Sequence, residues 1–265
     1  MKKRHLIYVA CLLVAMGACS ATSKERAKIT PDAWGKYNVG TVLFEDKAPE
    51  TKGSDIYHRI IPDAESYIKA QAREVLATLY NSPEDSIPMV NKIHYTLEDI
   101  EGVSAKGGGN GDVTIFYSTR HIEKSFAAND TAKLFFETRG VLLHELTHAY
   151  QLEPQGVGSY GTNRVFWAFI EGMADAVRVA NGGFDGPNAR PKGGNYMDGY
   201  RTAGYFFVWL RDNKDPEFLR KFNRSTLEVI PWSFDGAIKH ILGNEYNIDE
   251  LWHEYQVAVG DIQAQ

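Results

Sequence analysis

Two histidines four residues apart, in His144-Glu145-Leu146-Thr147-His148, constrain this chain more than any other feature of its sequence. The surrounding segment 138–152 is predicted to be helical, and residues four apart in a helix lie on one face, one turn above the other. Both imidazoles can therefore bind one metal ion, with Glu145 beside it as a proton acceptor. The alternative is a surface helix whose two histidines have ordinary structural roles.

A catalytic zinc site has three protein ligands and a fourth position open for water, so a third ligand is required. The extended metzincin pattern would supply another histidine six residues after the second one. That pattern also needs a glycine three residues after the second histidine. Gln151 and Pro154 stand at these two places, so the metzincin interpretation fails.

A second predicted helix, residues 164–180, is apolar around most of its circumference and yet contains Glu171 and Asp175. Carboxylates buried there without partners would be costly or would take up protons. A metal ion provides a partner for Glu171. Asp175, one turn further on, can accept the free N–H of a ligating histidine and fix its tautomer. For Asp175, a salt bridge with Arg178 is the alternative.

The composition is that of an ordinary globular protein. Of the 265 residues, 43% are apolar and 24% are charged. Such a chain buries enough apolar surface to fold without a structural metal or disulfide, so a metal would serve chemistry. The net charge of −5 argues against a general nucleic-acid binder, which needs a basic face, without excluding a local basic patch.

The N-terminus has the pattern of an export signal. Lys2, Lys3 and Arg4 precede an uncharged run over residues 6–18, which is shorter than the roughly 20 residues of a membrane-spanning helix. We therefore expect a signal peptide over residues 1–18 and an exported protein. A retained anchor helix is the alternative.

Cys19 follows small residues in an arrangement that resembles the lipobox of bacterial lipoproteins. The resemblance implies that Cys19 carries a lipid, which would hold the protein at the cell envelope or surface and be its one contact with a membrane. Plain secretion is the alternative. The polar residues 19–38 are predicted to be a tether between lipid and body.

Residues 39–265 are predicted to form one domain of the α+β class, with strands first and helices after them. Strands are expected at 41–44, 92–97 and 113–118, a helix at 63–80, and helices almost throughout from 131 onward. The glycine-rich run 107–111 lacks the Lys-Ser/Thr ending of a phosphate loop and is interpreted as a tight connection. The strand 113–118 either pairs with an extended substrate at the rim of a cleft or is an ordinary sheet edge.

The two motifs together resemble the gluzincin metallopeptidases, and more narrowly the peptidases of plants and bacteria named for the plant basic secretory proteins. The matching stretches are Gly140 to Gln151, Glu171 to Arg178, Gly199-Tyr200 and the aromatic run 206–210. Upstream, residues 111–122 are similar to the strand that precedes the active-site helix in that family. The resemblance covers about residues 40–225. It implies a zincin-like fold, with a small N-terminal mixed sheet before a mainly helical part, and peptide-bond hydrolysis in an exported protein.

We therefore expect a Zn²⁺ ion bound by His144, His148 and Glu171, with Glu145 as the general base and a peptide or protein as substrate. Tyr200, in a Gly-Tyr pair similar to that of the family, is the candidate donor to the oxyanion, and core packing is its alternative role.

Two other functions stay open. One is a non-catalytic surface protein that binds peptide or glycan on a zincin scaffold, although a pure binder has no use for the general base Glu145. The other is a zinc hydrolase of a non-peptide amide. No nucleic-acid partner is expected, and the sequence makes no prediction about oligomeric state.

Overall fold

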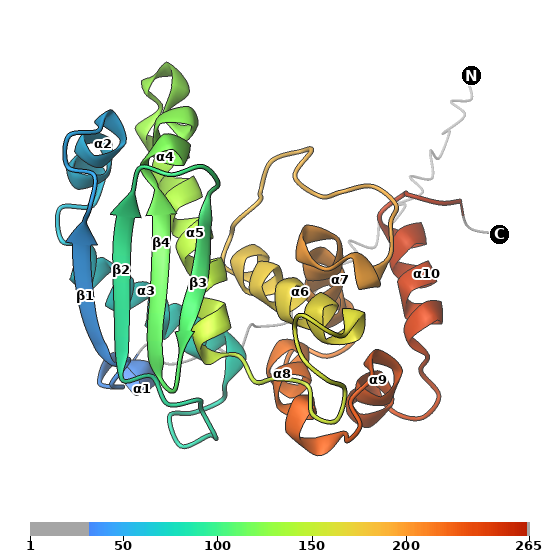
Figure 1. Ribbon diagram of the computed structural model, residues 1–265. Helices are drawn as coiled ribbons and strands as arrows, with labels where there is room; N and C mark the ends of the chain where they lie inside the picture. The colour runs from blue at the N-terminus through green and yellow to red at the C-terminus, as the bar shows by residue number, and fades with distance from the viewer. Residues whose placement is uncertain (1–31, 264–265) are drawn as a thin grey trace, which may run out of the picture.

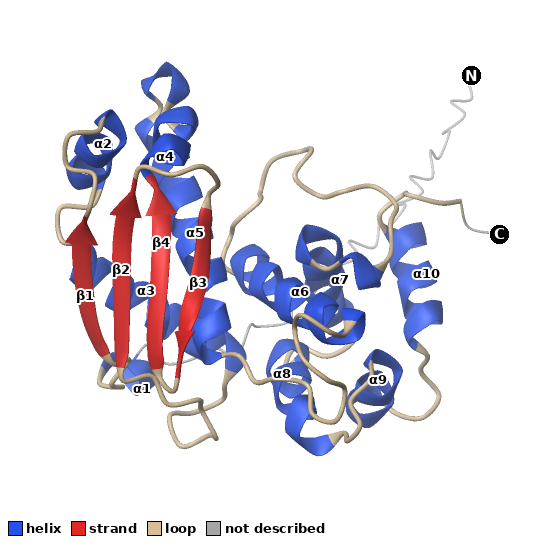
Figure 2. Ribbon diagram, in the orientation of Figure 1, coloured by secondary structure: helices blue, strands red, loops and turns tan. Residues whose placement is uncertain are grey.

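The computed structural model describes residues 32–263 and confirms the α+β class. A small mixed sheet in the N-terminal half is followed by a mainly helical C-terminal half (Figures 1 and 2). The predicted signal peptide and Cys19 lie outside the described residues. None of the helices between residues 32 and 263 combines the length and apolar character needed to cross a membrane.

The sheet has four strands in the order β1-β2-β4-β3. Their bounds are β1 (Thr41–Asp46), β2 (Lys92–Glu98), β3 (Ser104–Gly109) and β4 (Asp112–Ser118). β1, β2 and β4 are parallel, and β3 is antiparallel to β4, with register from Ser104 opposite Tyr117 to Gly109 opposite Asp112. The three parallel strands are those predicted, two of them from their content of β-branched and aromatic residues.

β3 corrects two predictions. Residues 107–109, interpreted as part of a tight connection, belong to this strand, and only Asn110 and Gly111 form the turn, with φ of 54° and 82°. Glycine has a low β-propensity, which is why the pattern missed the strand. The predicted strand 113–118 is also not an edge, because it lies between β2 and β3. The edge beside the helical half is β3 (Figure 1).

The described chain contains ten α-helices and two short 3₁₀ turns, at residues 127–129 and 196–198. The helices are α1 (Asp32–Gly35), α2 (Lys52–Ile60), α3 (Ala64–Leu79), α4 (Thr119–Ser125), α5 (Thr131–Tyr150), α6 (Arg164–Ala180), α7 (Tyr200–Asn213), α8 (Phe218–Glu228), α9 (Phe234–Leu242) and α10 (Ile248–Ala258). In α1, Trp34 is 3% exposed, so the packed body begins within the range predicted as a tether.

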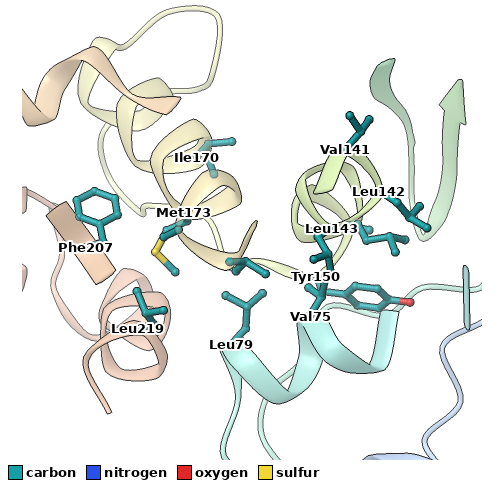
Figure 3. Close-up of a cluster of buried hydrophobic side chains, with 14 of the residues drawn as sticks. Val75, Leu79, Val141, Leu142, Leu143, Tyr150, Ile170, Met173, Phe207 and Leu219 are labelled. Carbon is teal, nitrogen blue, oxygen red and sulfur yellow. The ribbon is translucent and has the colours of Figure 1, made fainter. Parts of the chain in front are cut away.

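One hydrophobic core joins the two halves. Figure 3 shows side chains from α3 (Val75, Leu79), α5 (Leu142, Leu143), α6 (Met173), α7 (Phe207) and α8 (Leu219) within this core. Complete burial of a leucine or phenylalanine side chain stabilises the fold by about 1.5–3 kcal/mol. α5 packs against β3 of the sheet as well as against α3 and α6. Its position is therefore fixed relative to the sheet and to the helical half.

Candidate metal and catalytic site

The helix α5 presents both histidines to a cleft. Its first turn is capped by Asp130, whose side chain accepts a hydrogen bond from the backbone N–H of Lys133. Leu143 and Leu146 are completely buried on its core face, which leaves His144 and His148 on the opposite side. The packing of leucines therefore sets the direction of the two imidazoles.

Glu171 of α6 meets these imidazoles. Its Oε2 lies 3.3 Å from Nε2 of His144 and 3.7 Å from Nε2 of His148, and the two Nε2 atoms are 3.1 Å apart. Donor atoms in a tetrahedral zinc shell with bonds of about 2.0–2.1 Å are about 3.4 Å apart, so the three distances suit such an ion. Oε2 is buried and has no hydrogen-bond partner among the described residues. Two imidazoles and a carboxylate oxygen are also a donor set that favours zinc.

Asp175 lies behind His144, with Oδ1 2.7 Å from Nδ1 of that imidazole. This contact leaves Nε2 directed at Glu171. Although burial opposes it, the hydrogen bond to Asp175 and the nearby carboxylate of Glu171 raise the pKa of His144. Burial and the charge on His144 lower the pKa of His148. Arg178, the alternative partner for Asp175, instead donates to Glu137 at 2.6 Å.

The side-chain amide of Gln151 supports His148. Its Nε2 lies 2.8 Å from Nδ1 of His148, while its Oε1 is buried and has no partner within residues 32–263. A histidine that offers Nε2 to a metal carries its proton on Nδ1. A half-turn of the amide exchanges its oxygen and nitrogen at nearly the same positions. Oε1 then accepts a hydrogen bond from Nδ1–H of His148. Gln151 was considered as the residue that excludes the metzincin pattern and as the end of the stretch that resembles the family, but its contact with His148 was not predicted.

Tyr160 is the second residue that sequence analysis missed. It lies in the segment between α5 and α6, and its hydroxyl donates a hydrogen bond to Oε1 of Glu171. The residue is 47% exposed and lines the cleft. No spacing rule relates a tyrosine in an irregular segment to a glutamate in the next helix, so the sequence offers no signal for it.

Tyr200 lies over the ring of His144, with centroids 6.1 Å apart and planes inclined by 16°. The residue is 46% exposed, so it is not part of the core. A tight backbone turn places it there, because Gly199 and Tyr200 have φ of 65° and 41°. A Cβ at position 199 would lie 2.7 Å from the ring of Trp167, so glycine is required at this position.

A cleft of ≈660 Å³ runs between β3 and the helices α5 and α6. The carboxyl group of Glu145 contributes to its lining beside the histidines, and the residue is only 6% exposed. Burial raises the pKa of Glu145 above its usual range, against the opposing charge of His144. The cleft therefore brings a carboxylate, the three candidate metal ligands and the edge strand to one place.

The family model described as "Peptidase of plants and bacteria" matches residues 39–255, which is most of the chain. The chain belongs to this family of peptidases. The resemblance predicted from the two motifs is thereby confirmed. No curated protein and no solved structure matches the chain.

All six site residues predicted for this peptidase lie around the one cleft: His144, Glu145, His148, Glu171, Asp175 and Tyr200. They come from three helices, α5, α6 and the start of α7. The site residues on α5 and α6 could be predicted because the two motifs place them at helical spacing. The approach of α7 depends on the path of the segment 181–199, which no motif determines.

Proposed function

We propose that this peptidase is a zinc-dependent enzyme that hydrolyses peptide bonds with Glu145 as general base. The observation that carries the proposal is the convergence of His144, His148 and Glu171, whose ligand atoms all lie within 4.8 Å of one another. The buried Oε2 of Glu171, which no described residue pairs with a hydrogen bond, supports it further, because a buried carboxylate oxygen requires a proton donor or a cation.

When bound, a zinc ion supplies a Lewis acid that acidifies water and polarises the scissile carbonyl. Glu145 accepts the proton of the attacking water and delivers it to the leaving nitrogen. Tyr200, with its ring over His144, donates its hydroxyl proton in a hydrogen bond to the carbonyl oxygen as negative charge develops there. Asp175 and Gln151 hold the two imidazoles in the tautomers that leave Nε2 free.

The edge strand β3 is the proposed docking edge for the substrate backbone. It pairs with β4 on one side only, and residues 104–106 line the cleft beside Glu145. An extended peptide can add to such an edge through main-chain hydrogen bonds, which hold the scissile bond in place without regard to side chains. This role replaces the one considered for residues 113–118.

We further propose that the protein is exported and that the signal peptide ends before Cys19, which carries a lipid. The apolar run 6–18 and the small residues before Cys19 support this proposal. Mass spectrometry of the protein from its native membrane fraction tests it: a first residue at Cys19 with an added diacyl mass is expected. A mature start after Cys19 without lipid would show plain secretion.

Metal analysis combined with peptide cleavage tests the zinc proposal. The purified protein should contain one zinc ion per chain and cleave a diverse peptide library, and a chelator should abolish cleavage. Glu145→Gln should keep the zinc and lose turnover, whereas His144→Ala should lose both. His240→Ala is the matched control, because His240 forms an exposed pair with Glu228 outside the cleft and its loss should change neither.

Two outcomes would contradict the proposal. Full zinc content without cleavage of any peptide would favour a binding protein or a hydrolase of another amide. Near-normal cleavage by Glu145→Gln would remove Glu145 from the role of general base.

A further inference from the structure

Arg178 is a buried cation at one end of the cleft. It lies on α6, seven residues after Glu171, which corresponds to about 10 Å along the helix axis. Its side chain is 7% exposed and still contributes to the lining of the cleft, together with Val141 and Phe184. The metal site and the zinc-based proposal leave this arginine without a role.

The surrounding chain is built to hold the guanidinium group. A Cβ at position 140 of α5 would lie 2.3 Å from Nε and 2.6 Å from Cζ of Arg178, so only glycine leaves room for it. The ring of Phe184 packs on the guanidinium, with Cζ 3.7 Å from its centroid. Phe184 has a φ of 53°, a left-handed conformation that is strained for a residue other than glycine. Strain of this kind is typical of binding sites.

The guanidinium is incompletely paired. Its Nη2 donates to Oε2 of Glu137, while Nε has no partner among residues 32–263. Glu137 also contacts His121, at 3.2 Å, so it is not a partner of Arg178 alone. Asp175, which lies on α6 with Arg178, is hydrogen-bonded to His144 instead. Nε lies against the backbone of Gly140 and is closed to a ligand, so a further acceptor can reach only the part of the guanidinium that lines the cleft. A carboxylate is the acceptor that matches the planar fork of arginine.

The charges along the cleft differ between its two ends. Glu153 lines the end near the C-terminus of α5, Arg178 lines the opposite end, and Lys106 of β3 is a second cation in the lining. An acidic group on a bound peptide is therefore repelled at the first end and attracted at the second. Because an extended chain advances about 3.3 Å per residue, 10 Å corresponds to about three residues from the cleaved bond.

We propose that Arg178 binds a carboxylate of the substrate peptide within about three residues of the scissile bond, and that this peptidase therefore prefers acidic peptides. The carboxylate is that of an aspartate or glutamate side chain or that of a free C-terminus. The inference rests on the proposed function and specifies its substrate class. Arg178 is a specificity residue in this proposal, because it contacts the substrate away from the reacting atoms.

The test uses two series of matched peptides. In one series a glutamate is replaced by glutamine at each position around the cleavage site, and in the other a free C-terminus is replaced by an amide. Wild type should favour the acid over its amide in kcat/KM by about 10- to 100-fold in one of the series, which identifies the source of the carboxylate. Arg178→Gln should bring that ratio close to one.

Arg190→Gln is the control for loss of a partly buried, ion-paired arginine. Arg190 makes a double ion pair with Asp261, at 2.7 and 2.8 Å, outside the cleft. Its replacement should lower the melting temperature and leave the acid-to-amide ratio unchanged. If Arg178→Gln lowered kcat/KM equally for acids and amides, the arginine would have a purely structural role and the proposal would be wrong.

A measurement of peptide affinity tests the inference without requiring catalysis. It also does not depend on whether the Arg178→Gln protein folds. Calorimetry with the Glu145→Gln protein, whose Arg178 is intact, should show tighter binding of the acidic peptide than of its amide by a similar factor. Absence of cleavage would overturn the catalytic proposal and leave this ratio standing. Equal affinity for acid and amide in both series would overturn the role of Arg178.

Discussion

The hydroxyl of Tyr160 donates a hydrogen bond to Oε1 of Glu171, whereas Oε2 of the same carboxylate has no partner among the described residues. The two oxygens therefore have different roles. Oε1 is held by the chain, which fixes the orientation of the carboxyl group, and Oε2 faces the imidazoles of His144 and His148.

Tyr160→Phe should weaken zinc binding by about 10-fold, because a ligating carboxylate loses the partner that orients it. Competition with a chromogenic chelator measures the affinity. Tyr196→Phe is the control, since that hydroxyl donates to Asp249 outside the cleft, and its zinc affinity should equal that of wild type. Unchanged affinity in Tyr160→Phe would mean that packing alone orients Glu171.

Asp175→Ala should weaken zinc binding by about 10- to 100-fold, because His144 loses the acceptor at 2.7 Å that fixes its tautomer. The same competition measures the effect, and Asp175→Asn separates charge from hydrogen bonding. Wild-type affinity in both variants would show that Asp175 has only a structural role.

Tyr200→Phe should lower kcat by about 10²- to 10³-fold with little change in KM, because the hydroxyl acts on charge that exists only in the transition state. Zinc content and melting temperature should stay at wild-type values, since Tyr200 is 46% exposed. Unchanged kinetics would show that the hydroxyl of Tyr200 does not stabilise the transition state and that its ring only packs against His144.

Asp261→Asn should destabilise the protein in a pH-dependent manner. The ion pair with Arg190 holds the pKa of Asp261 below its usual range and joins the end of α10 to the long segment between α6 and α7 (Figure 1). A carboxyl whose pKa is lowered by folding contributes stability above its unfolded pKa of about 3.9, and this contribution disappears as the pH falls through the folded value.

The free energy of unfolding of Asp261→Asn should thus lie below that of wild type by about 1–3 kcal/mol at pH 7, and the difference should shrink below about pH 4. Urea denaturation at several pH values gives both quantities. A difference that stays constant down to pH 2 would contradict the assignment of the stabilisation to the charged pair.

The periodic parts of this chain could be predicted from its sequence, and the irregular parts could not. The strands near 41, 92 and 113 and the helices that carry His144 and Glu171 follow from patterns with a period of about 2 or 3.6 residues. β3 was missed because glycines hide its alternation. Its position at the edge depends on pairing with β4, which is a tertiary property.

The same division holds within the site. Residues four apart on one helix are neighbours by geometry, which is why His144 with His148 and Glu171 with Asp175 could be recognised. Gln151 is also a helical neighbour of His148, three residues after it, and could have been recognised in the same way, whereas Tyr160 reaches the site from outside any such spacing. Arg178 lies on the predicted helix, and Asp175 on that helix was considered as its partner. The partner is instead Glu137, which is 41 residues away in sequence.

The glycines at the end of β3 have a consequence for how this protein can diverge. Residues 107–109 extend, with a bare main chain, the edge that residues 104–106 present to the cleft, and under the proposed docking mode a main-chain edge holds diverse sequences. Discrimination then falls to the opposite wall, which includes residues of α6 and the irregular stretch containing Phe184. Selection can alter which sequences are cut by changing a few residues in that wall, while the machinery for bond cleavage and the sheet beneath it stay untouched.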